Sequence, residues 1–295
     1  MPRIPVGDAA RSGIDWLNVN ARWLFDLVTQ VMGFLIRELT SVLTSAPELV
    51  LIIAFALLAW VVRSWRLALG TVVAFLLIDA MNQWTAAMQT MALVLIATFI
   101  AIVIAVPLGI WAAKSNTVSA LLRPVLDFMQ TMPAFVYLIP VVFFFSIGAV
   151  PGLVSTIVFA LPPGVRMTEL GIRGVDAETV EAGHSFGASS WQILRGIQLP
   201  LAVPTIMAGI NQVIMLALSM AVIAGIVGTP GLGQQVVSSI ATLNLGMGVE
   251  AGLSVVILAI YLDRLTAALG RPGDNPSSLR TLAARRRQAR VRNDV

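Results

Sequence analysis

The sequence predicts an all-α integral membrane protein with about seven transmembrane helices. Of its 295 residues, 58% are hydrophobic and only 12% are charged, and the mean hydropathy is +0.89. Soluble globular proteins carry about 25% charged residues, so this chain has too few charges to solvate an ordinary water-facing surface. Charged residues are absent from three long stretches, 80–113, 128–165 and 196–249. A spanning helix needs about 20 apolar residues, so these stretches predict helices that cross a bilayer.

Glycine and proline divide the two longer uncharged stretches, at residues 148–152 and 228–231, because both residues interrupt helices. Arg63 and Arg66 separate the first two spans, which form an accessory pair within residues 47–85. The expected spans are 47–63, 67–83, 86–112, 124–147, 152–166, 201–227 and 248–265.

The N-terminal segment, residues 1–46, has a different pattern. Apolar residues recur at helical spacing from Leu24 to Val42, while Asp26, Arg37 and Glu38 fall on other faces. This pattern predicts an amphipathic helix that lies at the membrane interface and does not span. A helix packed on its own protein would show the same pattern, and the sequence leaves that alternative open.

The basic residues between the expected spans fall on one side of the membrane. The turns near 84, 150 and 230–246 contain no lysine or arginine, whereas the alternate loops and the tail at 269–295 contain many. The positive-inside rule places the basic loops in the cytoplasm, which predicts an external N-terminus and a cytoplasmic C-terminus in a plasma or inner membrane. The tail either lies near anionic lipid or is a solvated end. The basic residues that set this orientation are Arg63, Arg66, Lys114, Arg123, Arg166, Arg173, Arg195 and the arginines from Arg264 to Arg292.

The composition excludes several kinds of active site. The chain has no cysteine and a single histidine, His184, so thiolate or histidine metal sites are not expected. A phosphate loop requires a glycine before its lysine, but the only lysine is Lys114 and it follows Ala113. The chain is therefore expected not to be an enzyme and to bind neither a cofactor nor a metal. Its arginines lie at the ends of apolar runs, which argues against nucleic acid as a partner.

The longest basic loop, residues 166–200, carries the most specific pattern. Asp176 and Glu178 favour a helix start, Gly187 permits a positive φ at a turn, and Pro200 starts the next span. We therefore expect a helix, a glycine turn and a second short helix. Phe186 and Trp191 are apolar residues on a loop that faces water, which is typical of a partner interface.

This loop resembles the EAA motif of ABC importer permeases, in which E-A-A is followed by three residues, glycine, nine residues and I-x-L-P. Six positions match in identity and spacing, and Gly183 replaces the second alanine of the motif. Residues 166–200 are called the EAA loop below. The resemblance implies that the loop is a coupling helix that docks into a groove on an ATPase. The coupling residues that it implies are Glu181, Ala182, Gly183, Phe186, Gly187, Ile197, Leu199 and Pro200.

Further blocks are similar to permeases for glycine betaine and proline betaine, and they cover about residues 86–268. The resemblance implies a type I, MetI-like importer core in this range, and a homodimer of permeases with two cytoplasmic ATP-binding subunits that hold ATP and magnesium. It also implies an external solute-binding protein that delivers glycine betaine, proline betaine or choline for osmoprotection. The similar blocks are residues 130–140, 159–163, 185–189, 199–209 and 258–266.

Polar residues within the expected spans are candidates for a solute pathway. Asn211 and Gln212 lie in the middle of an uncharged run, where amides either bond across helices or line a wet path. Pro133 is expected to kink its helix beside polar groups, which suits either a gate or a packing bend. Both interpretations stay open for both groups. The second group consists of Gln130, Thr131, Pro133, Phe135 and Tyr137.

Two alternative functions compete with import of a compatible solute. The same architecture could import another small solute such as an amino acid, because selectivity is shared with a separate binding protein. A stand-alone secondary transporter is a different class. It is disfavoured because few ionisable residues lie within the spans, and because it leaves the EAA-like loop unexplained.

Overall fold

The computed structural model describes residues 6–270, and these residues form helices joined by short turns, with no strand among them. The expected basic tail lies outside the described residues except for Leu269 and Gly270. In chain order the helices are α1 Val6–Asn20, α2 Arg22–Ser45, α3 Glu48–Val62, α4 Trp65–Ala80, α5 Trp84–Lys114, α6 Asn116–Thr131, η1 Ala134–Tyr137, α7 Leu138–Phe145, α8 Ala149–Arg173, α9 Ala177–Ser185, α10 Ser190–Ile193, η2 Leu194–Gln198, α11 Leu199–Ile223, η3 Ala224–Val227, α12 Leu232–Ala241 and α13 Leu245–Gly270.

Within residues 6–270, five helical segments are long and apolar enough to cross a membrane, and a sixth is added if α6, η1 and α7 count as one bent span. Four of the five are α5, α8, the continuous helix 190–227 and α13, which coincide with four of the expected spans. The accessory pair is shorter than expected, since α3 has 15 residues and α4 has 16, against the about 20 that a span needs. The all-helical membrane fold is confirmed, and length and composition identify five or six spans within residues 6–270, where about seven are expected.

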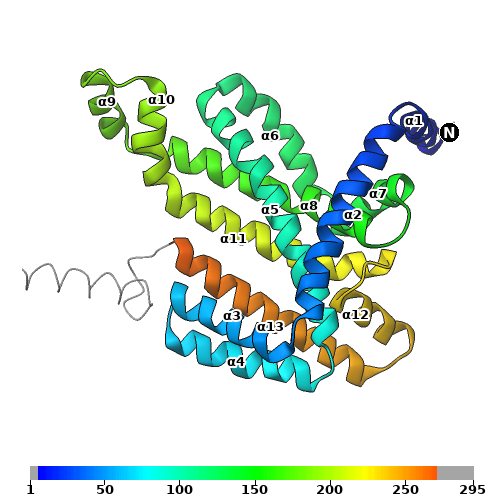
Figure 1. The fold of residues 1–295 in the computed structure, drawn as a ribbon. Coiled ribbons are helices and arrows are strands. Elements are labelled where there is room, and N and C mark those ends of the chain that lie inside the picture. Colours follow the sequence, from blue (N-terminus) through cyan, green and yellow to red (C-terminus); the bar gives the residue numbers. More distant parts are fainter. Residues whose placement is uncertain (1–5, 271–295) are drawn as a thin grey trace, which may run out of the picture.

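The fifth segment is α2, which the sequence analysis places at the membrane interface. It has 24 residues and meets the length and composition of a span. Figure 1 shows it running crosswise to α3, α4 and α13. Its residues line one cavity with Gln89, Ala149 and Pro230, which lie at or beside the turns that carry no basic residue. We call this side of the bundle the non-basic end, and α2 lies across it.

The opposite side, the basic end, gathers the positive residues of distant segments. The Arg63 guanidinium donates to the carbonyl of Arg264 at 3.1 Å, which joins the turn between α3 and α4 to α13. The Lys114 ammonium donates to the Gln198 side chain at 2.7 Å, which joins α5 to the end of the EAA loop. These contacts bring basic segments together in pairs, in agreement with the sequence pattern, which assigned all of them to the same side of the membrane.

The expected span over 124–147 is broken at the proline that the sequence predicts to kink it. Helix α6 already begins at Asn116 and ends at Thr131, and the chain then bends by 108° before η1 and α7. Pro133 causes the break, because a proline pushes the preceding residue out of the helical region. Met132 accordingly has φ −68° and ψ 130°, which is extended. The kink that the sequence predicts at Pro133 is therefore a sharp bend, somewhat larger than a right angle.

The accessory pair is attached to the bundle by aromatic side chains. The Phe75 ring lies 5.2 Å from the ring of Tyr261 and 6.2 Å from that of Trp84, and Phe55 lies 5.2 Å from Phe75. The Tyr261 hydroxyl donates to the backbone oxygen of Phe55 at 3.2 Å. This cluster fixes α3 and α4 against α13 and the start of α5.

The core consists of α5, α8 and α11, which approach closely at small residues. A Cβ on Gly109 of α5 would lie 2.5 Å from the Thr168 Cβ, and one on Gly209 of α11 would lie 2.5 Å from the Met167 Cβ. Small residues allow helix backbones to approach within a membrane, where burial of apolar surface does not drive association. The three helices therefore form one closely packed unit that supports the EAA loop at the basic end.

Helix α12 is an element that the sequence analysis does not expect. It follows η3 and the turn 228–231 at the non-basic end, and it packs back on the end of α11. A Cβ on Gly225 would lie 2.3 Å from the carbonyl carbon of Gly233, so the two backbones are in direct contact. The Thr90 hydroxyl accepts from the Leu232 amide at 2.8 Å, which pins α12 to α5.

Candidate functional site

The EAA loop has the local structure expected from the sequence. The Asp176 carboxylate accepts from the Thr179 amide at 3.3 Å and caps α9. Gly187 follows α9 with φ +78° in the left-handed region, where L side chains are disfavoured. Ser189 and Gln192 then form a capping box that starts α10, a feature that the sequence analysis missed although the spacing is recognisable. The helix, glycine turn and second short helix are confirmed as structure.

The inner residues of the motif hold the two short helices together. Gly183 is buried in α9, and a Cβ there would lie 2.8 Å from the Ile197 Cδ1 and 3.3 Å from the Ile193 Cγ1. The glycine that replaces the second alanine therefore brings α9 directly onto these isoleucines. Leu199 is half-buried and packs with Ile172, Leu194 and Ala202. Gly183, Ile197 and Leu199 therefore pack inside the loop and do not form its exposed surface.

The outer residues of the motif are displayed. Phe186 is 92% exposed and Trp191 is 64% exposed. Glu181 and Ala182 are exposed beside them on α9. Among the described residues, the Glu181 carboxylate is part of no ion pair. Figure 1 shows α9 and α10 projecting beyond the other helices, so the loop presents two large rings and an acid to whatever lies next to it.

Arg173, a residue that the motif does not include, fixes the base of the loop. Its guanidinium donates to the Ala112 carbonyl at 2.8 Å and to the Asn116 side chain at 2.9 Å, and it pairs with Glu169 at 3.0 Å. Glu169 also accepts from the Ser119 hydroxyl at 2.7 Å. The end of α8 is thereby tied to the turn between α5 and α6. The sequence gives only a weak signal for this role of Arg173. It is a basic residue at the end of a span, and the sequence analysis used it only to assign the orientation of the chain in the membrane.

A π-helical segment, Leu194–Gln198, joins α10 to α11. Residues 190–227 consequently form one helical run of 38 residues. Pro200 is exposed at the start of α11, directly after the π-helical segment, and it has no backbone amide to donate within this continuous run. Helix α10 is therefore continuous with the span through this segment.

The candidate pathway residues fall into two separate groups. Gln130, Thr131 and Phe135 are exposed on α6 and η1, and Gln212 is exposed on α11. Tyr137 is buried, with its hydroxyl bonded to the Met129 carbonyl and its ring 5.5 Å from that of Phe159. It fixes the bend after Pro133 to α8, so its side chain has a packing role.

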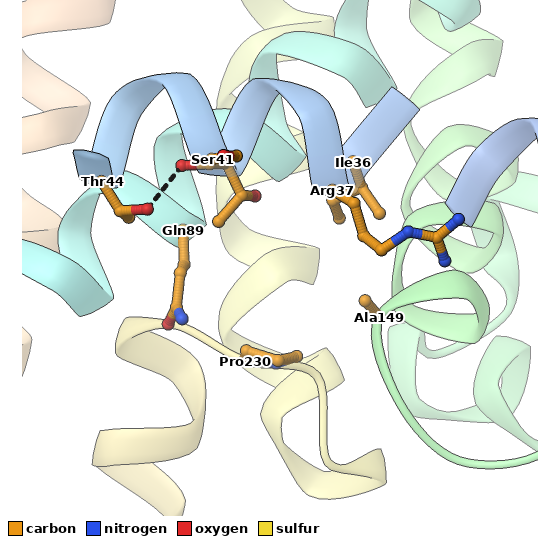
Figure 2. A pocket seen from close by; sticks show the side chains of 8 residues that line it. Ile36, Arg37, Ser41, Thr44, Gln89, Ala149 and Pro230 are labelled. Carbon is orange, nitrogen blue, oxygen red and sulfur yellow. Dashed lines mark hydrogen bonds between the residues drawn. The ribbon is translucent and has the colours of Figure 1, made fainter. Parts of the chain in front are cut away.

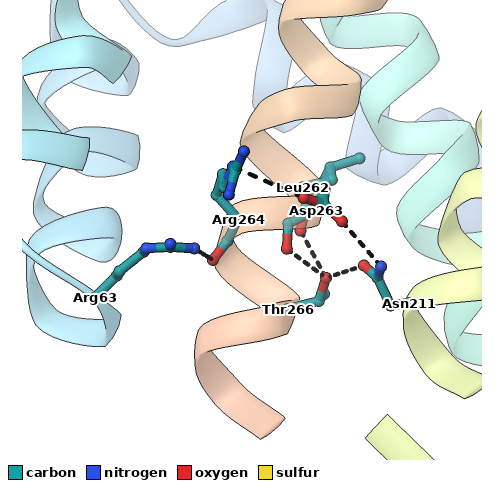
Figure 3. A network of polar contacts seen from close by, with 6 residues as sticks. All are labelled: Arg63, Asn211, Leu262, Asp263, Arg264 and Thr266. Atoms are coloured by element: carbon teal, nitrogen blue, oxygen red, sulfur yellow. Dashed lines mark hydrogen bonds and ion pairs between the residues drawn. The ribbon is translucent and has the colours of Figure 1, made fainter. Parts of the chain in front are cut away.

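The Asn211 amide forms hydrogen bonds to a neighbouring helix, which is one of its two interpretations; the other was that it lines a wet path. Its Nδ2 donates to the Asp263 carboxylate at 2.9 Å, and its Oδ1 accepts from the Thr266 hydroxyl at 2.6 Å. Figure 3 shows this network between α11 and α13, with the contact of Arg63 to Arg264 beside it. The network joins α11 to α13 near the basic end.

Two cavities lie along α2 at the non-basic end, and the sequence analysis predicted neither. The first, of about 380 Å³, is shown in Figure 2 between α2 and the turns at Ala149 and Pro230. Gln89 extends toward Pro230 in this view, and Arg37 extends past Ala149. The second, of about 360 Å³, lies between the start of α2 and the end of α7.

Comparison with known proteins agrees with this architecture. The family of the binding-protein-dependent transport system inner membrane component matches residues 105–271. A glycine betaine transport system permease of Bacillus subtilis is 49% identical over 266 residues, which are 90% of this chain and 94% of that protein. A glycine betaine/proline betaine transport system permease of Escherichia coli is 49% identical over 268 residues, covering 91% and 76% respectively.

A solved structure supports the fold independently. The MetNI methionine ABC transporter in an inward-facing conformation matches with a TM-score of 0.56 at 23% identity, over 62% of this chain and 92% of that one. This likeness concerns the arrangement of helices in the core. The match over residues 105–271, which is more than half of the sequence, identifies the family. The chain belongs to the family of binding-protein-dependent transport system inner membrane components.

Proposed function

We propose that this chain is the membrane-spanning permease subunit of an ATP-driven importer of compatible solutes, namely glycine betaine, proline betaine or choline. The observation that carries the proposal is the EAA loop, which displays Phe186 and Trp191 at the end of a helical run that continues through the membrane. Relatives whose names specify glycine betaine or proline betaine are about half identical along most of the chain, which supports this class of solute.

ATP and magnesium belong to a separate subunit in this proposal. The lone lysine, Lys114, follows an alanine and bonds to Gln198, so it has no phosphate loop around it. Two ATP-binding subunits would bind a homodimer of this chain, one at each EAA loop. An external binding protein would deliver the solute to the non-basic end.

The geometry supports a direct mechanism of coupling. A run of 38 residues is about 57 Å long at 1.5 Å per residue. One end carries α10, and the other ends at η3, whose Gly225 backbone touches α12. A push on Phe186 and Trp191 by the ATPase would therefore be passed along one continuous helical backbone to the turn at the non-basic end.

The proposed orientation places the basic end in the cytoplasm and the non-basic end outside. The contacts of Arg63 with Arg264 and of Lys114 with Gln198 support it, because they gather basic loops from three parts of the chain on one side. The C-terminal end of α13 then lies in the cytoplasm, and α1 and α2 lie outside. Residues 47–85 serve as an accessory pair beside an importer core over 86–268.

Solute would pass along the exposed polar residues of the bent α6–η1 segment and of α11. Gln130, Thr131, Phe135 and Gln212 remain the proposed pathway residues, because their side chains are exposed in the single chain. Exposed amides on spanning helices are unfavourable against lipid, so a second subunit or water must face them. Pro133, Tyr137 and Asn211 act by holding these segments in place.

The test is uptake of labelled glycine betaine into proteoliposomes that contain this chain with its ATPase. Uptake should require the ATPase, ATP and the binding protein together, and excess proline betaine or choline should compete. Uptake that follows an ion gradient without the ATPase would overturn the proposal. ATPase activity that is stimulated by an amino acid but not by glycine betaine would support an importer function but contradict the proposed solute.

A further inference from the structure

The cavity between the start of α2 and the end of α7 combines an aromatic wall with a charged wall. It has a volume of about 360 Å³. Phe25 of α2 and Phe144 and Phe145 of α7 form the aromatic wall, and Arg22 and Asp26 of α2 form the charged wall. Figure 1 shows α7 beside α2 and α1 at the end of the bundle remote from α9.

Three phenylalanine rings line one side of the cavity and contact one another. Phe25 stacks on Phe144 with centroids 4.5 Å apart, and it meets Phe145 edge-on at 5.7 Å. The facing surfaces of Phe25 and Phe144 cover each other, but all three side chains are only half-buried, so part of each ring remains accessible. A cation within about 6 Å of such a ring is attracted by its negative face, and ligands with a quaternary ammonium group exploit this attraction.

The charged wall supplies both signs one helical turn apart. Arg22 and Asp26 approach only to 3.8 Å, with their side chains 81% and 62% exposed. A pair this long and this open to water is weak, so each group is available to a ligand. A zwitterion could place its ammonium group toward Asp26 and the rings, and its carboxylate toward Arg22.

Backbone strain at the wall of the cavity is an independent sign of a site. Ser146 directly follows Phe145 and has φ +63° and ψ −152°, a region that only glycine occupies readily. Strained residues of this kind cluster at ligand sites. Here the strained turn ends α7 immediately after Phe145, so it fixes where the second ring of the wall stands.

We propose that this cavity binds a trimethylammonium group that carries a nearby oxyanion, and that it captures such a ligand at the external surface before transport. The inference rests on the proposed function, which places the non-basic end outside and supplies a betaine as the solute. Two sources share this chemistry: free glycine betaine, and the headgroup of a choline phospholipid. If the rings only pack α2 against α7, neither will bind.

The experiment measures equilibrium binding of labelled glycine betaine to the purified chain in nanodiscs, without the ATPase or the binding protein. The nanodiscs contain phosphatidylglycerol and phosphatidylethanolamine in one arm and added phosphatidylcholine in the other. Phe144→Leu and Asp26→Asn are the test variants, and Phe99→Leu is the matched control, since Phe99 is a 69% exposed phenylalanine of α5 outside this cavity. Thermal stability of each variant identifies any that fail to fold.

We expect saturable binding that tetramethylammonium displaces. Each test variant should weaken it about tenfold, and Phe99→Leu should not change it. Phosphatidylcholine that competes, and that copurifies with the unmodified chain but not with Phe144→Leu, would identify the lipid headgroup as the occupant. Absence of saturable binding in both arms would overturn the proposal, and so would binding by Phe144→Leu and Asp26→Asn that is as tight as binding by the unmodified chain. Because no ATPase is present, a failure of ATP-driven uptake would leave this result unaffected and would count against the importer alone.

Discussion

The EAA loop and the core of α5, α8 and α11 use apolar and small residues in opposite ways. In the core, Gly109 and Gly209 bring helices together until a single added carbon would collide with the neighbour. In the EAA loop, one glycine packs α9 onto its isoleucines, but the largest side chains, Phe186 and Trp191, face outward. The core satisfies its own surface, whereas the loop leaves apolar surface unsatisfied at the basic end.

This difference separates what the chain must do alone from what it does with a partner. Substitutions in the core should act on folding, because the contacts are already complete within the chain. Substitutions on the displayed face of the loop should leave folding intact and act on assembly, because the missing contacts belong to another subunit. Each of the following variants tests this distinction between folding and assembly.

The largest effect is expected for Gly225→Val, at the contact of η3 with α12. Its Cβ would lie 2.3 Å from the Gly233 carbonyl carbon, which is backbone and cannot move aside as a side chain would. We expect a loss of stability of more than about 3 kcal/mol, and therefore little assembled protein. Size-exclusion chromatography of the detergent-extracted chain measures this. Gly196→Val is the control, since nothing lies within 4 Å of a Cβ there; equal recovery of the two variants would contradict the packing argument.

Phe186→Ala should leave folding unchanged and weaken binding of the ATPase. A ring that is 92% exposed in the free subunit contributes nothing to the core, but a central aromatic residue of an interface contributes about 2 kcal/mol, or roughly a thirtyfold change in Kd. Trp191→Ala should behave alike. Titration of the purified ATPase onto the permease gives the Kd, and thermal unfolding gives the stability. An unchanged Kd in both variants would show that the ATPase does not dock on the face formed by Phe186 and Trp191.

Substitutions of Gly187 should separate the effect of backbone conformation from the effect of side-chain size. Its φ of +78° costs a branched L residue about 1–2 kcal/mol, while asparagine tolerates this region far better. Nothing lies within 4 Å of a Cβ at this position, so bulk itself meets no obstacle inside the chain. We expect Gly187→Val to insert in the membrane but to lose most coupled uptake, and Gly187→Asn to retain most of it. Similar uptake by the two variants would show that the turn conformation is not what positions α10.

The sequence predicts elements whose cause is local and misses those whose cause is distant. The turn at Gly187, the cap at Asp176 and the break at Pro133 depend on a few neighbouring residues, and each was predicted at the right place. The size of the bend after Pro133 depends on where Tyr137 and Phe159 meet, which no local pattern encodes. Helix α12 is likewise held by Thr90, more than 140 residues earlier in the chain.

The candidate site divides in the same way. The EAA motif has a fixed spacing, so its residues could be found without a structure. The amides at 211 and 212 had two interpretations each, and only the approach of Asp263 to Asn211 showed that this one joins two helices. The aromatic cavity brings together Phe25 of α2 and Phe144 of α7, which are separated in the chain by α3, α4, α5, α6 and η1. The sequence therefore offered no pattern by which to find it.

The smallest effect is expected at Gly183, where the loop behaves like the core. The family pattern has alanine at this position, but here a Cβ would lie 2.8 Å from the Ile197 Cδ1, the far end of a flexible side chain. Gly183→Ala should therefore weaken ATPase binding by only about 1 kcal/mol. Ile197→Val removes that terminal methyl group and should restore the affinity in the double variant. A double-mutant cycle on the ATPase Kd measures this coupling. Additive effects of the two substitutions would show that α9 is not positioned by Ile197, and that the loop surface is independent of its own small core.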